Sequence, residues 1–274
     1  MICELINSVR RKKNLSKVGG VVLEKTLTPL IPTKIGLSAK DVIYLIVFRE
    51  LQNGPKYIKE LFDSVINESV NLKSKSYIYQ AVQDMDLRGW ISCIETRGKR
   101  RIMTITTSGI KKHEQFINTY LNLLQRLKGA ADYFAYIITG SGSREQPIWD
   151  EGVLKHFNRL ISVRHLARYL FLLILNDLEH KSGTVVNIYE LMEKRYNWQC
   201  GEGYIYDLAH EMEDISNGWV EGKWNSIRRH HYIYRLTDIG VLMISKEGEA
   251  ALNYIRNLQQ YTRSLLRLFP TRDK

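Results

Sequence analysis

The chain repeats one pattern twice, and this repetition constrains its fold more than any other feature. The tripeptide Tyr-Ile-Tyr occurs at residues 77–79 and again at residues 204–206. A long apolar run, a glycine-containing turn and a short amphipathic run precede each copy, and a Gly-Trp pair and two β-rich runs follow it. Each copy then reaches Thr-x-x-Gly, at 106–109 and 237–240, which opens another long helical pattern. The repetition indicates that one supersecondary unit is used twice.

The first copy predicts three helices, a β-hairpin and a long helix. Apolar residues recur at helical spacing after the candidate N-cap Ser38, over residues 57–66 and over residues 75–88. Residues 91–105 contain two β-rich runs joined by a short turn with a glycine, which is typical of a hairpin. A further helix is expected over residues 106–127, where apolar residues recur in steps of three and four.

The second copy predicts the same order of elements. Helices are expected over residues 163–178, 186–196 and 203–217, a hairpin over 220–236 and a last helix over 237–269. The inward face of the third helix is predicted to carry Ile205, Leu208, Met212 and Ile215.

This order of elements is that of a winged helix with an added C-terminal helix. The predicted class is α+β, mainly α-helical with small β-hairpins: two tandem winged-helix domains, each followed by a long helix. We expect four segments: a basic N-terminal arm over 1–37, a first domain over 38–127, a connector over 128–160 and a second domain over 161–274.

The composition supports a nucleic-acid partner. The chain has 274 residues, 44% of them hydrophobic, which is enough for two folded domains. Its 40 Lys and Arg residues against 29 Asp and Glu residues give a net charge of +11. Such an excess favours an anionic partner, either nucleic acid or an acidic membrane surface.

The sequence also argues against several other classes of protein. Its three cysteines, Cys3, Cys93 and Cys200, lie far apart without a C-x-x-C motif, so neither a disulfide framework nor a zinc site is expected. Without a P-loop, GxSxG or metal-binding histidine motif, we expect no enzyme, no cofactor and no metal. The longest apolar run, residues 169–175, is too short to span a bilayer. No apolar stretch precedes the basic run 10–13, so we expect a cytoplasmic protein without a signal peptide.

Several motifs of the first unit resemble the PadR family of bacterial and archaeal transcriptional regulators. Residues 78–82, Ile-Tyr-Gln-Ala-Val, and residues 89–91, Gly-Trp-Ile, are similar to the family's Leu-Tyr-Pro-Ala-Leu and the Gly-Leu-Ile seven residues after it. The family's Gly-Pro followed by Tyr is matched by residues 54–57. Its basic wing leading into Thr-x-x-Gly is matched by residues 97–101 and 106–109.

The resemblance covers most of residues 38–127 and is weaker in the second unit, where Asp207 stands at the motif's proline position. It implies a winged-helix regulator of transcription that binds double-stranded DNA and dimerises through its C-terminal helix. Repression by occupying an operator is expected rather than activation. Ordinary members of the family carry one winged helix per chain, so the tandem arrangement departs from their pattern.

A recognition helix needs polar and basic groups on the outward face of its first turns, because these groups reach base edges in the major groove. The candidates in the first unit are Lys73, Lys75, Ser76, Tyr77, Gln80 and Gln83. A solvated helix face is the alternative interpretation. The resemblance implies that Tyr79 packs at the edge of the core. Contacts to phosphates are expected from the basic hairpin turns of the two units, at Arg97, Lys99, Arg100, Arg101, Arg228 and Arg229.

The third helix of the second unit is predicted to stay out of the major groove. It carries four carboxylates and no Lys or Arg over residues 203–217, and carboxylates repel phosphates. We therefore expect it to meet protein or water. The four acidic residues are Asp207, Glu211, Glu213 and Asp214.

An apolar stripe on the last helix predicts an oligomeric or internal seam. Its members recur in steps of four and three, so they lie on one face of the helix. We expect a homodimer, with a matching stripe on the first unit's last helix as the alternative partner within the chain. The stripe consists of Tyr254, Leu258, Tyr261, Leu265 and Leu268.

Two other functions are compatible with the sequence. A plasmid or phage protein of replication initiation or segregation would also use tandem winged helices, on repeated sites. A protein-interaction module would use the same fold to bind protein, which the acidic third helix of the second unit favours for that unit.

Overall fold

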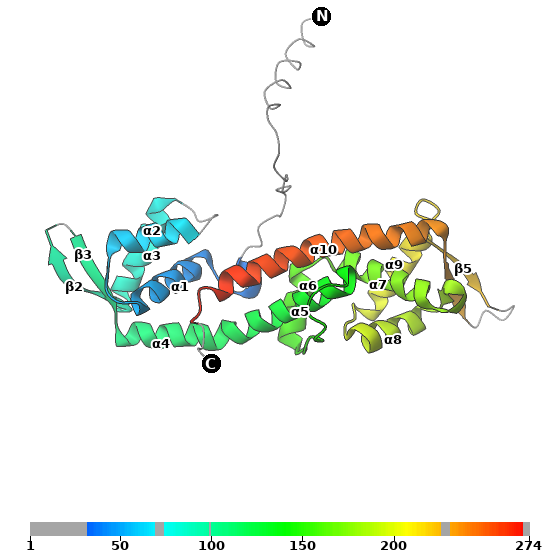
Figure 1. The fold of residues 1–274 in the computed structure, drawn as a ribbon, viewed down its shortest axis with the longest axis horizontal. Coiled ribbons are helices and arrows are strands. Elements are labelled where there is room, and N and C mark those ends of the chain that lie inside the picture. The colour runs from blue at the N-terminus through cyan, green and yellow to red at the C-terminus, as the bar shows by residue number, and fades with distance from the viewer. Residues whose placement is uncertain (1–31, 69–73, 99, 226–230, 271–274) are drawn as a thin grey trace, which may run out of the picture.

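The structure is a computed structural model, and it describes residues 32–68, 74–98, 100–225 and 231–270. Helices dominate it, together with two small antiparallel sheets, which confirms the predicted α+β class (Figure 1). The predictions for Lys73, Lys99, Arg228 and Arg229 fall outside the described residues, as does most of the expected basic arm 1–37. The arm's last residues are described and are not a free arm, because they form η1 and bury Ile35 and Leu37 in the core.

The first unit runs from η1 to α5. Helix α1 begins with a capping box formed by Ser38 and Asp41, which confirms Ser38 as the predicted N-cap. One π-helical turn joins α4 to α5, so the two form one long rod (Figure 1). The elements are η1 (Pro32–Ile35), α1 (Ala39–Gln52), β1 (Lys56–Tyr57), α2 (Ile58–Glu68), α3 (Lys75–Leu87), β2 (Ile91–Arg97), β3 (Arg100–Ile105), α4 (Thr107–Phe116), η2 (Ile117–Leu121) and α5 (Asn122–Thr139).

The second unit has the same succession after one additional helix, α6. Its sheet has the strand order β4-β6-β5, which matches the order β1-β3-β2 in the first unit. The elements are α6 (Glu151–Leu160), α7 (Val163–Asp177), η3 (Glu179–Lys181), β4 (Ser182–Gly183), α8 (Val185–Tyr196), α9 (Glu202–Glu213), β5 (Val220–Trp224), β6 (Tyr232–Leu236) and α10 (Asp238–Leu266).

The Thr-x-x-Gly motif caps the long helix that follows the hairpin in both units. The Thr106 side chain accepts a hydrogen bond from the backbone N–H of Gly109 at 3.1 Å and so caps α4. A Cβ at Gly109 would lie 2.0 Å from the carbonyl oxygen of Trp90, so only glycine fits there. In the second unit the Thr237 side chain accepts a hydrogen bond from the backbone N–H of Gly240 at 3.0 Å. A Cβ at Gly240 would lie 2.1 Å from the carbonyl oxygen of Trp219.

Two segments differ from the sequence-based expectation. The rod continues past Leu127 to Thr139, and α6 is also helical, so much of the segment expected as a connector is helix. Buried Ala130, Ala131 and Phe134 continue the apolar face of α5, but small residues give a weak periodic signal. In the second unit α9 ends at Glu213. Ile215, expected to face inward, is instead fully exposed, because it lies in the turn after the helix.

The last helix packs within the chain. α10 runs antiparallel to α5 and also contacts α7, so the rods of the two units lie side by side and the two hairpins lie at opposite ends of an elongated molecule (Figure 1). Leu258, Tyr261, Leu265 and Leu268 are buried in this packing, whereas Tyr254 stays 44% exposed. Most of the stripe predicted to hold a dimer together is therefore covered by the chain itself.

Candidate nucleic-acid interface

The outward face of α3 carries an uncharged polar stripe. Ser76, Gln80 and Gln83 are exposed, and Lys75 is exposed in the first turn. These residues keep the outward positions that the sequence predicts. The helix is held from its other side by buried residues, also as predicted, namely Ile78, Ala81, Val82 and Met85.

The two tyrosines of α3 differ in how far they are covered. Tyr77 is half-buried and packs against the core, because it lies four residues before the buried Ala81 and so on the same face of the helix. Tyr79 is 56% exposed and stacks on Phe62 of α2, with ring centroids 5.3 Å apart. Tyr77 is therefore more covered than expected, whereas the stacking of Tyr79 on Phe62, which itself packs against the core, agrees with the core-edge position expected for Tyr79. Tyr79 joins the outward stripe.

The basic residues of the first hairpin differ in whether an acidic side chain pairs with them. Arg97 donates to Glu95 at 2.6 Å, and this hydrogen bond lowers the pKa of the Glu95 carboxyl. Arg101 donates to Asp86 of α3 at 2.9 Å, which braces the hairpin against the helix. Arg100 is exposed, and no acidic side chain in the described part of the chain pairs with it. Among the described cations of this hairpin, Arg100 is thus the one most available to a phosphate.

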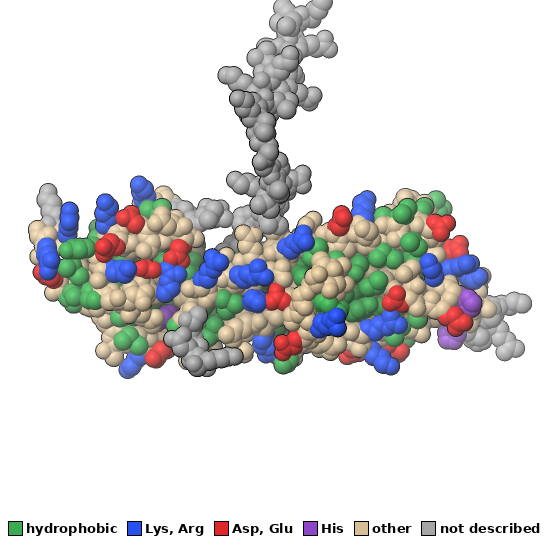
Figure 2. All heavy atoms as spheres, viewed as in Figure 1, with side chains coloured by type: hydrophobic (Ala, Val, Ile, Leu, Met, Phe, Trp, Pro, Cys, Tyr) green, Lys and Arg blue, Asp and Glu red, His purple; other side chains and the backbone are tan. Residues whose placement is uncertain are grey.

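Acidic side chains interrupt the basic surface around the first hairpin. In Figure 2 the Lys and Arg side chains over this end of the molecule are interspersed with Asp and Glu. The net charge of the chain therefore does not appear as one continuous basic patch on this face, and contacts to phosphates depend on individual side chains such as Arg100.

A polar network locks α3 onto α1 behind the outward stripe. The Asp84 carboxylate accepts hydrogen bonds from the Tyr44 hydroxyl and from Arg88, and it forms an ion pair with Lys40 at 2.9 Å. The Tyr44 hydrogen bond, followed by that of Lys40, lowers the pKa of Asp84 to about 2. The rings of Tyr44 and Trp90 meet edge to face, with centroids 5.2 Å apart. The network holds α3 at a defined angle to the hairpin that follows it.

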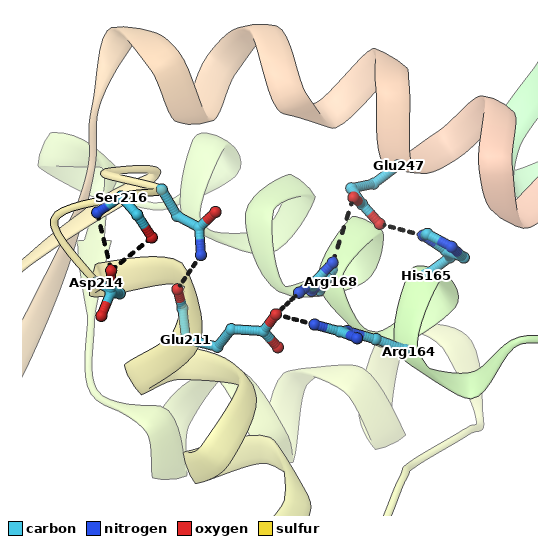
Figure 3. Close-up of polar contacts among 8 residues, drawn as sticks. Arg164, His165, Arg168, Glu211, Asp214, Ser216 and Glu247 are labelled. Atoms are coloured by element: carbon cyan, nitrogen blue, oxygen red, sulfur yellow. Dashed lines mark hydrogen bonds and ion pairs between the residues drawn. The ribbon is translucent and has the colours of Figure 1, made fainter.

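The second unit builds the same network from different side chains. Glu211 of α9, at the position of Asp84, accepts hydrogen bonds from Arg164 and Arg168 of α7 (Figure 3). These arginines follow Ser162, which precedes α7, by the same two and six residues that separate Lys40 and Tyr44 from Ser38. The Arg168 guanidinium lies 4.9 Å from the ring centroid of Trp219, much as Tyr44 packs against the corresponding tryptophan.

Arg168 also joins α7 to α10. Its side chain is 8% exposed and lies 3.6 Å from Glu247, whose own side chain is 6% exposed. His165 contacts the other oxygen of Glu247 at 2.6 Å, so one buried carboxylate has two partners on α7 (Figure 3). The Nε of Arg168 is buried without a hydrogen-bond partner among the described residues. This cluster ties α7, α9 and α10 together.

Three of the four carboxylates in and just after α9 therefore have structural partners, and of the four predicted to repel phosphates only Asp207 lies exposed without a partner among the described residues. Glu211 is bound to two arginines, Glu213 accepts a hydrogen bond from the Tyr232 hydroxyl, and Asp214 accepts one from the backbone N–H of Ser216 in the following turn. The outward face of α9 instead carries Tyr204, Tyr206, Asp207 and His210.

Sequence reasoning missed the aromatic surface of the second unit. Tyr204 and Tyr206 are 37% and 39% exposed, and Trp224 at the end of β5 is 47% exposed. The repeated tripeptide was a signal for the first two, because both tyrosines of the second copy flank the buried Ile205 and so lie at the surface of α9. No cysteine, histidine or carboxylate group of three or more that could hold a metal ion occurs within the described residues.

Two further observations bear on the class of protein. Within the described ranges, no helix combines the length and the apolar character that crossing a membrane requires. Comparison with family models gave no match, and comparison with curated proteins gave none either.

Proposed function

We propose that the chain consists of two tandem winged-helix domains and binds double-stranded DNA, with α3 of the first unit as the helix that reads sequence. The observation that carries this proposal is the uncharged polar stripe of α3 beside the hairpin that presents Arg100, which has no acidic partner in the part of the chain that the structure describes. Glutamine side chains can bond two atoms of an adenine edge at once, and serine suits either kind of base pair. An arginine on the adjoining hairpin suits a phosphate or a narrow minor groove.

The division of labour follows from the pairing of the side chains. Gln80 and Gln83 have no charge to neutralise and act as base readers. Arg100 supplies the charge contact, whereas Arg101 acts through Asp86 by holding the hairpin at its angle to α3. We infer a regulator of transcription similar to the PadR family, acting as a repressor that occupies its operator.

The seam between α5 and α10 lets one chain supply both halves of a two-fold-like arrangement. The antiparallel rods place one unit at each end of the molecule (Figure 1). A homodimer, which the family resemblance implies, would need a surface other than the buried part of the α10 stripe.

The test is duplex binding at several salt concentrations, by fluorescence anisotropy, on a site selected from a random library. Each phosphate that a Lys or Arg neutralises releases counterions on binding, and should contribute about −0.9 to the slope of log K against log salt. Gln80→Ala should lose roughly 1–3 kcal/mol on the selected site and little on random duplex, whereas Arg100→Ala should weaken both and reduce the slope by about 1.

Gln125→Ala, at an exposed position on α5, is the matched control and should leave binding unchanged. Absence of duplex binding at low salt would overturn the proposal. Equal losses for Gln80→Ala on the selected and the random duplex would remove α3 as the sequence reader.

A specific observation favours a second candidate, a replication-initiation or segregation protein. The outward faces of α3 and α9 differ, one polar and one aromatic, so the two ends of the molecule do not offer equal surfaces to a palindrome. Genome-wide mapping of bound sites separates the candidates: an array of direct repeats near an origin favours this one, and a single promoter palindrome favours the repressor.

A further inference from the structure

We propose that Trp224, on the hairpin of the second unit, is a stacking platform for an unpaired nucleobase and gives this unit affinity for single-stranded DNA. The inference rests on the proposed function and deepens it, because it assigns a substrate class to the second unit. Trp224 is the last residue of β5 and is 47% exposed. A large aromatic side chain with so much free surface at a hairpin end is available to a partner.

A chain of aromatic contacts holds the indole in place. Trp224 lies opposite Tyr232 in the hairpin register, and their rings meet edge to face with centroids 5.1 Å apart. Tyr232 meets Tyr234 in the same way at 5.1 Å, and Tyr234 meets the fully buried Phe171 at 6.2 Å. The Tyr232 hydroxyl also donates to Glu213 of α9. The platform is therefore connected to the core and is ordered before any ligand arrives, which lowers the entropy cost of binding.

The corresponding part of the first hairpin is held by an ion pair instead of stacked rings. There Arg101 braces the hairpin by its ion pair with Asp86, the position that Glu213 occupies in the second unit. In the strand pairing, Thr96 lies opposite Arg101 as Trp224 lies opposite Tyr232, because an irregularity between Cys93 and Glu95 adds one residue to β2. The same frame thus presents charged groups at one end of the molecule and stacked rings at the other, which suits phosphates in one case and base faces in the other.

The helix beside the platform favours a single strand over a duplex. α9 has no Lys or Arg, so it lacks the donors that read guanine in the major groove. It adds the exposed rings of Tyr204 and Tyr206 instead. Lys223 and Arg235 are exposed on the other face of this hairpin, because side chains alternate along a strand and these two lie out of phase with Trp224. The exposed rings of this unit therefore suit a single strand, because every unpaired base has a face that can stack on an aromatic side chain.

The experiment measures binding of the full chain to a labelled single-stranded 20-mer and to an intact duplex, for the wild type and for Trp224→Ala and Trp224→Phe. Loss of one base stack predicts a roughly 5- to 150-fold weaker affinity of Trp224→Ala for the single strand. The duplex affinity should change less than about twofold, and the salt dependence should keep its slope because no charge is removed. Trp224→Phe keeps a ring and should retain most of the affinity.

Tyr254→Ala is the matched control, since Tyr254 is 44% exposed on α10 and lies outside the hairpin. It should leave single-strand binding unchanged, and thermal melting confirms that each variant is folded. The inference is overturned if Trp224→Ala binds the single strand like the wild type, if it weakens single strand and duplex alike, or if Trp224→Phe is as weak as Trp224→Ala. A wild type that binds duplex but not single strand also overturns it, whereas a wild type that does not bind duplex overturns the proposed function.

Discussion

Replacing Arg168 tests whether the buried cluster of the second unit stabilises the fold. Arg168 and Arg164 bind the same carboxylate oxygen of Glu211, but their side chains are 8% and 53% exposed. Substitution of either by methionine keeps an unbranched side chain and removes the charge. The two variants therefore compare a buried and an exposed partner of one acid.

The expected magnitudes differ by several-fold. Arg168→Met leaves Glu247, whose side chain is 6% exposed, with His165 as its only partner among the described residues. Breaking a buried pair in this way costs about 3–5 kcal/mol, because a desolvated charge loses its compensation. Arg164→Met breaks an exposed pair, for which about 0.2–1 kcal/mol is expected.

Urea denaturation of the purified variants, followed by circular dichroism, gives the free energies of unfolding. Adding Glu247→Gln to Arg168→Met should restore part of the loss, because the stranded carboxylate is then neutral, and the double-mutant cycle measures that coupling. The reasoning is refuted if Arg168→Met costs no more than Arg164→Met, or if Glu247→Gln adds its full effect independently of Arg168.

Three further outcomes are expected. Gly109→Ala should lower the melting temperature, because its Cβ would lie 2.0 Å from the backbone carbonyl oxygen of Trp90. A Cβ at Gly129 in α5 has no atom within 4 Å, so Gly129→Ala should stabilise the fold by up to about 1 kcal/mol. Equal melting temperatures of the two variants in calorimetry would contradict this. The pKa of Asp84 is lowered from 3.8 to about 2, so the carboxylate's stabilisation is lost as pH falls between these values. Asp84→Asn should therefore flatten the acid limb of the unfolding free energy, and an unchanged limb would count against the network. Leu258→Asp places a charge at a fully buried position and should lower the melting temperature while light scattering shows the wild-type mass; a smaller mass with unchanged melting would indicate an interchain seam.

The sequence predicted those parts of the fold that depend on local pattern. The buried face of α3 followed from the helical spacing of Ile78, Ala81, Val82 and Met85. The start of each rod followed from Thr106 and Thr237, because a threonine cap is a local interaction that a four-residue motif reveals. Both signals lie within one or two helical turns, where spacing alone determines which side chains meet.

Contacts between distant residues were beyond prediction from pattern. Glu211 looked like a free acid on an outward face, but it pairs with Arg168, 43 residues earlier in the chain. Arg168 itself lies within a helix whose apolar run gave no hint of a buried charge. The covering of Tyr77 was not predicted, because Tyr77 and Tyr79 both flank the buried Ile78 and only the packing against neighbouring helices decides which ring is covered.

The two units keep one frame while the side chains that maintain it change. A carboxylate on the third helix binds two residues of the first helix in both units, through Asp84 with Lys40 and Tyr44 and through Glu211 with Arg164 and Arg168. The arrangement of the first and third helices thus depends on the positions at which polar side chains meet, and less on the chemical identity of those side chains. Because the rods α5 and α10 join the units within one chain, their arrangement does not depend on protein concentration, as a dimer's would. A chain of this kind is free to give its two ends different surfaces, since no symmetry requires them to match.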